Sequence, residues 1–272
     1  MSIFNAIVLG VIQGLTEFLP VSSSGHLVLL QKIFGISEPA MFFDTMVHMG
    51  TLLAVFVVLW RDIWAILRRL IQPLTGLLIL ATIPTVIAAL VFGEIIEHAF
   101  ESGQFLGFSF LATTALLITA ELLSKRGLAD KSLKKAEEVN WLDALVIGIL
   151  QAIAIIPGIS RSGATISGAL SRKLDRDFAA RFSFLLSIPA ILGAVVFQLK
   201  DMVKDNAAVE AGSGVGAGAI IAGTVSAAVV GFFAVRFMLI IIKKRSLFGF
   251  AIYTAVLGTL VLVDQFVTHF VF

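Results

Sequence analysis

Long runs of apolar residues, separated by short polar stretches, dominate the chain from one end to the other. A helix needs about 20 consecutive, mostly apolar residues to cross the hydrocarbon core of a bilayer. Four runs are uninterrupted, and two more are rich in Gly and Ala, as packed membrane helices often are. Together they predict six transmembrane helices, over Phe42–Trp60, Pro73–Phe92, Gln104–Leu123, Phe178–Gln198, Ser213–Val235 and Leu247–Phe272.

Two further apolar regions are interrupted by turn-forming residues. Ile3–Leu19 runs into Pro20–Gly25 before the apolar pattern resumes at His26, and Trp141–Ile156 likewise runs into Pro157–Gly163. Each half is too short to cross comfortably, and irregular backbone at membrane depth is tolerated only inside protein or beside a water-filled cavity. We therefore predict two re-entrant helical hairpins, which complete an all-α integral membrane fold together with the six spans.

The composition agrees with a membrane protein and excludes several other classes. Hydrophobic residues make up 58% of the chain and charged residues 14%, and the mean hydropathy is +1.02. In soluble domains about 45–50% of the residues are hydrophobic and about 25% are charged. We therefore expect a single polytopic membrane domain over residues 1–272. The chain has no Cys, which excludes disulfides, thiolate catalysis and Cys-ligated metals. The net charge of +2 gives no reason to expect nucleic acid, because basic residues in a membrane protein mainly set its orientation.

The basic residues predict which side each segment faces. Most of them fall into four clusters, within Arg61–Arg69, Lys125–Lys135, Arg172–Arg181 and Arg236–Arg245. The Gly93–Gly103 segment, predicted as a loop, instead carries three Glu and no Lys or Arg. The positive-inside rule places the four clusters in the cytoplasm and this loop outside. The first hairpin then enters from outside, the second enters from inside, and both chain ends lie outside.

The two interrupted regions align with each other without a gap at a spacing of 138 residues. Gly10, Gln13, Ser22, Ser24 and Gly25 fall on Gly148, Gln151, Ser160, Ser162 and Gly163. Each region precedes three spans, and the basic clusters orient the two copies oppositely. This layout predicts an inverted repeat whose binding site lies where the halves meet, with chance similarity between Gly/Ser-rich segments as the alternative. The first copy covers about residues 1–123, a cytoplasmic linker about 124–140, and the second copy about 141–272.

Polar and charged residues gather at both predicted hairpin tips. The first tip carries Gln13, Glu17 and the run Ser22–His26, and the second carries Ser160, Arg161, Ser162 and Thr165. A charge in the hydrocarbon centre costs at least about 2.5–3.5 kcal/mol. Glu17 and Arg161 are therefore candidates for function, with a purely structural ion pair between the hairpins as the alternative.

These groups suit phosphate chemistry. The planar guanidinium of Arg161 matches phosphate oxygens in pairs, and serines and glycines at a helix start form an anion site. Glu17 can hold a hard divalent cation, and His26 can transfer a proton, although a histidine that only packs or caps a helix is the alternative for His26. The pattern predicts phosphoryl transfer or pyrophosphate cleavage on a lipid-tailed substrate. Asp44 and His48, four residues apart, are either an indirect structural pair or a metal site.

Two long motifs resemble the signatures of one family. The segment Gln13–His26 resembles the first signature of the bacterial undecaprenyl-diphosphate phosphatases of the bacitracin-resistance type, and Pro157–Thr165 resembles the second. Phe43–Thr51 and Phe250–Tyr253 also fit, so the resemblance runs nearly end to end. Many members carry Glu where this chain carries Gln13, a departure that the family pattern allows.

The resemblance implies hydrolysis of undecaprenyl diphosphate to undecaprenyl phosphate and phosphate, in the bacterial inner membrane, at a site open to the periplasmic side. It also implies indirect resistance to bacitracin and dependence on a divalent cation, Mg²⁺ or Ca²⁺, with Glu17 as a metal ligand. The residues implied as catalytic are Glu17, Ser23, His26 and Arg161. The residues expected to bind the substrate are Gln13, Ser22, Ser24, Gly25, Ser160, Ser162, Gly163 and Thr165.

Three alternatives stay open at this point. A transporter or flippase for a lipid phosphate would also use an inverted repeat with Arg and Ser at its centre. The nucleophile is either Ser23, with His26 three residues away as its base, or an activated water. The oligomeric state is open as well, with a homodimer as one candidate.

Overall fold

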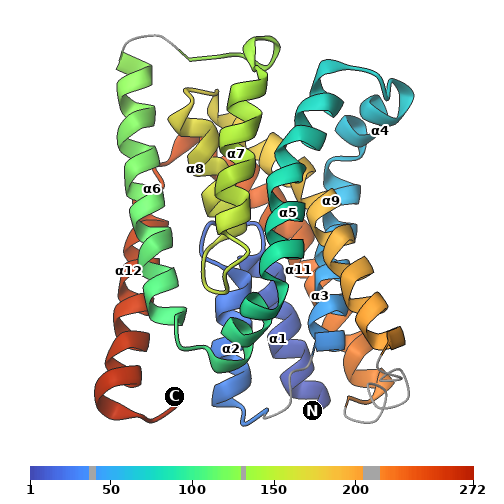
Figure 1. Ribbon diagram of the computed structural model, residues 1–272, viewed down its shortest axis with the longest axis vertical. Helices are drawn as coiled ribbons and strands as arrows, with labels where there is room; N and C mark the ends of the chain where they lie inside the picture. The colour runs from blue at the N-terminus through green and yellow to red at the C-terminus, as the bar shows by residue number, and fades with distance from the viewer. Residues whose placement is uncertain (37–40, 130–132, 205–214) are drawn as a thin grey trace.

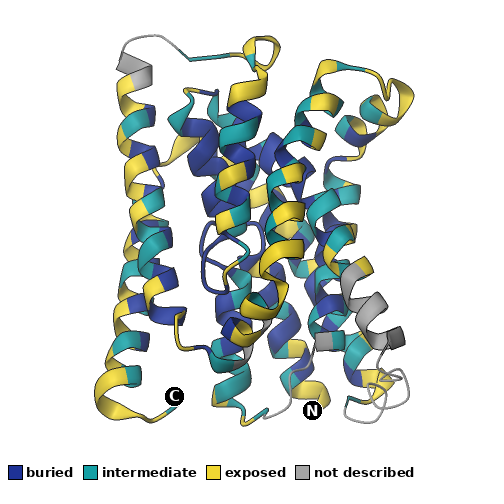
Figure 2. Ribbon diagram, in the orientation of Figure 1, coloured by how far each residue is buried: buried dark blue, intermediate teal, exposed yellow. Residues whose placement is uncertain are grey.

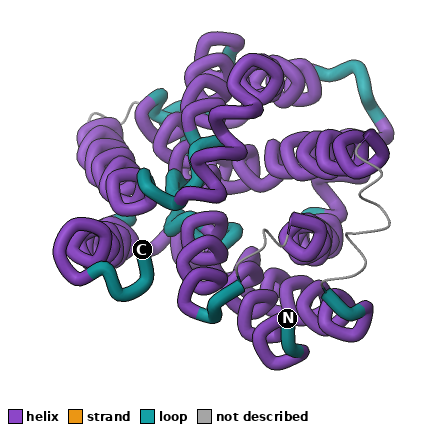
Figure 3. The backbone as a smooth tube through the Cα atoms, turned by 60° about the horizontal axis from the view of Figure 1, so that its bottom comes forward, coloured by secondary structure: helices purple, strands orange, loops and turns teal. Residues whose placement is uncertain are grey.

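The computed structural model describes residues 1–36, 41–129, 133–204 and 215–272. Nearly all of this part of the chain is helical, and the described residues form no strand beyond one isolated bridge, between Lys134 and Leu174 (Figure 3). A 3₁₀ turn, Ala136–Glu138, and a π-helical turn, Asp264–Thr268, accompany the α-helices. The α-helices are α1 (Ile3–Thr16), α2 (Ser23–Ile33), α3 (Met41–Val58), α4 (Trp60–Arg68), α5 (Pro73–Ser102), α6 (Leu106–Ala129), α7 (Trp141–Ile153), α8 (Arg161–Ser171), α9 (Arg176–Lys204), α11 (Ala217–Lys244) and α12 (Phe248–Val263).

Several of these helices are long and apolar enough to cross a membrane. The described residues contain five such helices, or six if the bent pair α3 and α4 counts as one span. The all-α membrane class is thereby confirmed, and the chain is a multi-pass membrane protein. The exact number of spans stays a prediction.

The predicted loop Gly93–Gly103 is wrong. α5 continues through it to Ser102, and the backbone only kinks at Phe92, where φ is −116° and ψ is 15°. A single Gly inside an exposed helix costs only about 1 kcal/mol, which explains why Gly93 does not end the helix. The helix ends instead at Gly103, whose φ of 64° gives the left-handed conformation typical of a C-terminal cap.

The first basic cluster also differs from the expected connector. Arg61 and Arg68 belong to α4, which is bent by 78° from α3. Trp60 and Trp64 stack on each other on this helix with ring centroids 5.5 Å apart, and both are exposed. Exposed tryptophans beside arginines are typical of a helix that lies along a membrane interface.

The two hairpins enter the molecule from opposite ends, as predicted (Figure 1). α1 and α2 occupy its lower half, α7 and α8 occupy its upper half, and the two tips meet near the centre. The tips are dark blue in Figure 2, because most of their residues are buried. Both chain ends lie at the lower end with the turn at Gly103, whereas α4 lies at the upper end. The charge pattern therefore assigns the lower end to the outside, and this sidedness stays a prediction.

The first helix of each hairpin packs against the other half of the chain. α1 lies along α11, and α7 lies along α5. The matched glycines Gly10 and Gly148 make both crossings possible. A Cβ at Gly10 would lie 2.2 Å from the carbonyl oxygen of Gly223, and one at Gly148 would lie 2.5 Å from that of Ala81. This reciprocal packing is what an inverted repeat predicts, and the repeat itself stays a prediction.

Buried ion pairs hold the upper end of the molecule together. The fully buried carboxylate of Asp143 accepts hydrogen bonds from Lys134 at 2.8 Å and from Arg172 at 2.7 Å. Lys134 belongs to the predicted linker, whose backbone also bonds to the turn after α8. Arg176 donates to the buried Glu121 at 2.9 Å. These contacts tie α7 to the linker and to the end of α8, and α9 to α6.

Candidate active site at the meeting of two hairpins

The same short motif starts the second helix of each hairpin. Ser22 caps α2 by accepting a hydrogen bond from the backbone N–H of Gly25 at 3.3 Å. Ser160, its counterpart 138 residues later, caps α8 by accepting from Gly163 at 3.0 Å. Serine is a favoured N-cap because its hydroxyl satisfies a backbone donor that the helix leaves free. The capping hydrogen bond is therefore the same at both tips, whereas the backbone differs, with φ of 73° at Ser22 and −71° at Ser160.

The two tips hold each other directly through backbone groups. The backbone N–H of Gly158 donates to Ser24 Oγ at 3.4 Å, and Ser162 Oγ donates to the carbonyl oxygen of Leu19 at 3.0 Å. Gly25 comes so close to the second hairpin that an added Cβ would lie 3.0 Å from the Cα of Gly158. The prediction that the two tips lie together is confirmed.

A buried carboxylate gathers most of the expected site residues. Glu17, only 7% exposed, forms an ion pair through Oε1 with the guanidinium of Arg161 on the other hairpin. Its Oε2 accepts hydrogen bonds from Ser23 Oγ at 2.5 Å and from Gln13 Nε2 at 3.0 Å. One carboxylate thus connects the candidate nucleophile, the candidate phosphate ligand and the matched glutamine.

Arg161 uses only part of its donor set in this ion pair. Its Nη2 donates to Glu17, whereas its Nη1 is buried and has no hydrogen-bond partner among the described residues. A buried charged donor without an acceptor is costly unless a ligand supplies one. The free Nη1 therefore marks a place for an anionic oxygen of a ligand.

His26 lies elsewhere in the site than expected. Its Nδ1 is 2.6 Å from the carbonyl oxygen of Ser22, so this nitrogen carries the proton, because a carbonyl can only accept. Its Nε2 is 2.6 Å from the hydroxyl of Tyr253, which donates to this nitrogen when the ring is neutral. Ser23 bonds to Glu17 instead, so the expected Ser23–His26 pairing is wrong for this structure.

Tyr253 is a residue that the sequence argument left out of the site. It comes from α12, 227 residues after His26, and its ring stacks on the imidazole with centroids 5.7 Å apart and planes 5° from parallel. The only sequence signal was its place in the closing Phe250–Tyr253 motif. Its partner could not be inferred, since no spacing rule relates these two positions.

Other expected phosphate ligands have structural partners on the long helices α9 and α6. Thr165 Oγ1 lies 2.6 Å from Ser183 Oγ of α9, and the backbone N–H of Ser160 donates to Thr113 Oγ1 of α6 at 3.0 Å. Thr165 and Ser160 are buried. Both residues help to position the tip that carries Arg161, and their contact with substrate stays a prediction, as it does for Ser22, Ser24, Gly25, Ser162 and Gly163.

Asp44 and His48 both lie on α3, and His48 reaches the site. His48 Nδ1 is 2.6 Å from the backbone carbonyl oxygen of Asp44, and the side chain of Asp44 accepts from Gln31 at 2.7 Å. His48 Nε2 faces the site and lies 3.7 Å from Glu17 Oε2. The two residues therefore play different parts, since only His48 contacts the central carboxylate.

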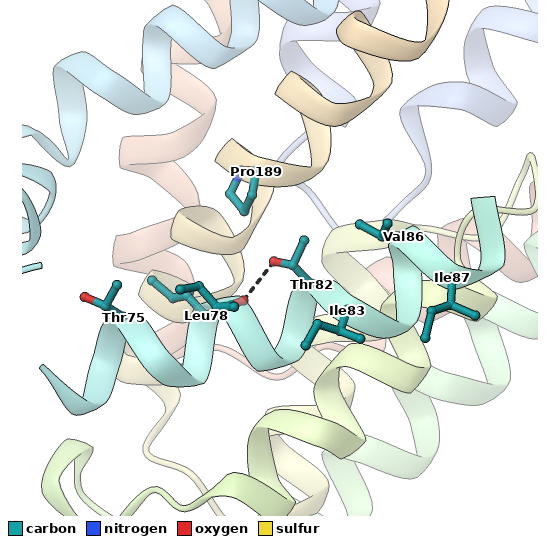
Figure 4. Close-up of a pocket in the computed structure, with 8 residues that line it drawn as sticks. Thr75, Leu78, Thr82, Ile83, Val86, Ile87 and Pro189 are labelled. Carbon is teal, nitrogen blue, oxygen red and sulfur yellow. Dashed lines mark hydrogen bonds between the residues drawn. The ribbon is translucent and has the colours of Figure 1, made fainter. Parts of the chain in front are cut away.

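An apolar groove between α5 and α9 contains none of these residues (Figure 4). It has a volume of about 380 Å³. The hydroxyl of Thr82, which lines it, donates to the carbonyl of Leu78 at 2.8 Å, and no charged side chain lines it. Its surface suits hydrocarbon and offers nothing for phosphate chemistry. The lining residues are Thr75, Leu78, Ile79, Thr82, Ile83, Val86, Ile87 and Pro189.

Comparisons with known proteins agree with the motifs at the two tips. Residues 6–260 match the sequence model of the family described as "Bacitracin resistance protein BacA". The "Undecaprenyl-diphosphatase" of Carboxydothermus hydrogenoformans is 47% identical over 265 residues, which cover 97% of this chain and 98% of that one. "Undecaprenyl-diphosphatase 3" of Bacillus cereus is 43% identical over 270 residues, 99% of this chain and 100% of its own. Since these matches extend over nearly the whole length, the chain belongs to the bacitracin-resistance BacA family.

Proposed function

We propose that this protein hydrolyses undecaprenyl diphosphate to undecaprenyl phosphate and inorganic phosphate, which recycles the carrier lipid for envelope polymers and gives resistance to bacitracin. The buried Nη1 of Arg161, which has no hydrogen-bond partner among the described residues, carries the proposal, because it can donate to an anionic oxygen of a ligand. The carboxylate of Glu17, which binds this guanidinium, also accepts from the hydroxyl of Ser23. The names of the full-length relatives support the same activity and substrate.

The geometry suggests how the residues divide the work. Ser23 Oγ, oriented by its hydrogen bond to Glu17 Oε2, attacks the terminal phosphorus, and its proton passes to the phosphoryl group that it takes up. Arg161 holds a phosphate oxygen through Nη1, and the P–O bond to the lipid phosphate breaks. Water then attacks the phosphorus of the phosphoserine and gives a proton to the Tyr253 hydroxyl, whose own proton passes to His26 Nε2. The bond between phosphorus and Ser23 Oγ breaks, phosphate leaves, and Ser23 Oγ takes back the proton from the phosphoryl group.

A divalent cation, Mg²⁺ or Ca²⁺, is part of the proposal. Glu17 supplies an oxygen of the kind that both ions prefer, and the buried carbonyl Oε1 of Gln13 has no hydrogen-bond partner among the described residues. These donors fit an ion bound through oxygen. When bound, the ion would neutralise charge on the diphosphate.

We also propose the inner membrane as the location, with the site open to its outer side. The hairpin that carries Glu17, Ser23 and His26 enters from the end with both chain termini, which the positive-inside rule assigns to the outside. A homodimer stays a prediction.

Phosphate release from undecaprenyl diphosphate by the purified protein in detergent tests the activity directly. We expect release that a chelator abolishes and that added Mg²⁺ or Ca²⁺ restores. Release that continues unchanged in chelator would remove the cation from the proposal. If no phosphate were released under any condition while the protein still bound the lipid specifically, the lipid-phosphate transporter would be favoured. The names of the relatives do not favour a transporter.

A further inference from the structure

His48 presents a lone pair to the central carboxylate. Its Nδ1 lies 2.6 Å from the carbonyl oxygen of Asp44 and must carry the ring proton, because that oxygen can only accept. In the neutral ring, Nε2 is then an acceptor, and it lies 3.7 Å from Glu17 Oε2. Two acceptors face each other across this gap, so a positive species belongs between them.

A third donor is present at the same carboxylate. Gln13 contacts Glu17 Oε2 through its amide nitrogen, while its carbonyl Oε1 is buried without a hydrogen-bond partner among the described residues. A buried amide oxygen that accepts no hydrogen bond is rare in folded proteins. It is an oxygen of the type that binds divalent cations.

We propose that Glu17 Oε2 and His48 Nε2 together bind the divalent cation, with Gln13 Oε1 as a further oxygen donor. The inference rests on the cation in the proposed function and adds a nitrogen ligand to it. Bonds of about 2.0–2.2 Å from one ion to each of two ligands leave the ligand atoms about 3–4 Å apart, in agreement with the observed gap.

The nitrogen ligand has a consequence for selectivity. Carboxylate and carbonyl oxygens suit Mg²⁺, Ca²⁺ and Mn²⁺, whereas imidazole favours later transition metals. A site with one imidazole therefore binds Mn²⁺ more tightly than Ca²⁺, and loss of the imidazole narrows this preference.

The competing arrangement is a protonated His48 that forms an ion pair with Glu17. The two arrangements predict opposite effects of the same substitution. If His48 is a ligand, His48→Gln removes a bond to the ion and weakens its binding. If His48 is a cation, His48→Gln removes a repelling charge, and the ion binds as tightly as before or more tightly.

Mn²⁺ binding to the purified protein in detergent, without substrate, distinguishes His48 as a metal ligand from His48 as a protonated partner of Glu17. We expect the electron paramagnetic resonance spectrum of bound Mn²⁺ to show coupling to an imidazole nitrogen. Labelling the histidines of the unmutated protein with ¹⁵N should change this coupling. His48→Gln should abolish the coupling and weaken binding by tenfold or more. His26→Gln, which changes the other histidine of the site, should keep both the coupling and the affinity.

Absence of nitrogen coupling in the unmutated protein would overturn the proposal, even if His48→Gln failed to fold. Unchanged or tighter Mn²⁺ binding by a folded His48→Gln protein would overturn it as well. Phosphate release measured on the same unmutated protein keeps the two questions apart. Release without nitrogen coupling would contradict only the role of His48, and no release with any cation would contradict the proposed function.

Discussion

At the scale of single residues, Arg161 connects the two hairpins and still keeps a free donor. Nη2 holds Glu17, and Nη1 remains for a ligand. A planar guanidinium can serve both partners at once because its donors point in fixed, diverging directions. Lys has a single nitrogen on a flexible stem and cannot reproduce this arrangement.

Arg161→Lys should therefore lose most activity although the charge is kept. One charge-assisted hydrogen bond is worth about 1.5–3 kcal/mol, which corresponds to a loss of roughly ten- to a hundredfold in kcat/KM. Steady-state phosphate release measures the effect, with Arg126→Lys on the exposed end of α6 as the matched control. Turnover within a factor of three of the unmutated enzyme would contradict the paired role of the guanidinium.

Ser23→Ala distinguishes the two nucleophiles. If Ser23 attacks, its loss should nearly abolish hydrolysis while the lipid still binds, and a phosphoserine should be trapped at position 23 in the active enzyme. If a water attacks, the substitution removes one hydrogen bond to Glu17 and costs on the order of tenfold. Ser171→Ala is the control, because Ser171 Oγ donates to the carbonyl oxygen of Gly168 within α8 and does not contact Glu17. Retention of more than about a tenth of the rate would exclude the serine.

The residues of the site were largely predictable, but their partners were not. The motif around Glu17 and the run Gly158–Thr165 identified both tips, because charges and serines inside apolar sequence are conspicuous. The bond of Ser23 to Glu17 instead of His26 depends on how the chain turns after Pro20, which spacing along an ideal helix does not describe. Tyr253 and His48 join the site only through packing of α12 and α3.

At the scale of elements, two small residues decide how closely the hairpins pack. Gly10 and Gly148 each bring a hairpin helix against the backbone of a long helix in the other half. Such close contacts are typical of membrane helices, whose association depends on packing because lipid already solvates apolar side chains.

Gly10→Ala and Gly148→Ala should each lower the apparent Tm in detergent. The added Cβ meets backbone atoms at 2.2 Å and 2.5 Å, so the helices must move apart, at a cost of about 1–3 kcal/mol. Gly76→Ala in α5 is the matched control, since a Cβ there has no neighbour within 4 Å. We expect its Tm to be unchanged or higher, because Ala favours helix. Equal Tm values for all three variants would contradict the packing argument.

Helix positions followed from hydropathy, whereas helix ends did not. The apolar run that was predicted to end at Phe92 marks the kink in α5, and the polar turns beyond it stay helical to Ser102. Hydropathy reports where lipid surrounds a helix and not where its hydrogen bonds stop. The bend between α3 and α4 was missed for a similar reason, since Leu59 is apolar and carries no turn signal.

At the scale of the whole molecule, the charge pattern and the fold agree. The acidic stretch at the end of α5 and both chain ends share one end of the molecule, and α4 lies at the other (Figure 1). Opposed hairpins could be predicted because interrupted apolar runs and basic clusters are both visible along the chain. The reciprocal packing of α1 on α11 and α7 on α5 needed the structure.

The orientation can be tested with single cysteines in this Cys-free chain. Ser102→Cys should react with a membrane-impermeant thiol reagent in intact cells, and Ser132→Cys should react only after the membrane is opened. Ser102 ends α5, and Ser132 lies in the predicted linker, outside the described residues. The reverse labelling would invert the topology and place the hairpin with Glu17 on the cytoplasmic side.

The matched hairpin tips share their capping serines and glycines but not their reactive side chains. The 138-residue correspondence that pairs the capping serines also pairs Glu17 with Ile155, Ser23 with Arg161 and His26 with Ala164. Wherever one copy contributes a reactive group, the other contributes a different group or none. In the proposed mechanism, neither half can therefore act as a phosphatase by itself, and the chain has one reaction centre with a fixed direction instead of two equivalent ones. In the same mechanism, a lipid diphosphate must arrive with its terminal phosphate toward Ser23 and Arg161, so the similarity between the two hairpin sequences does not extend to the reacting groups.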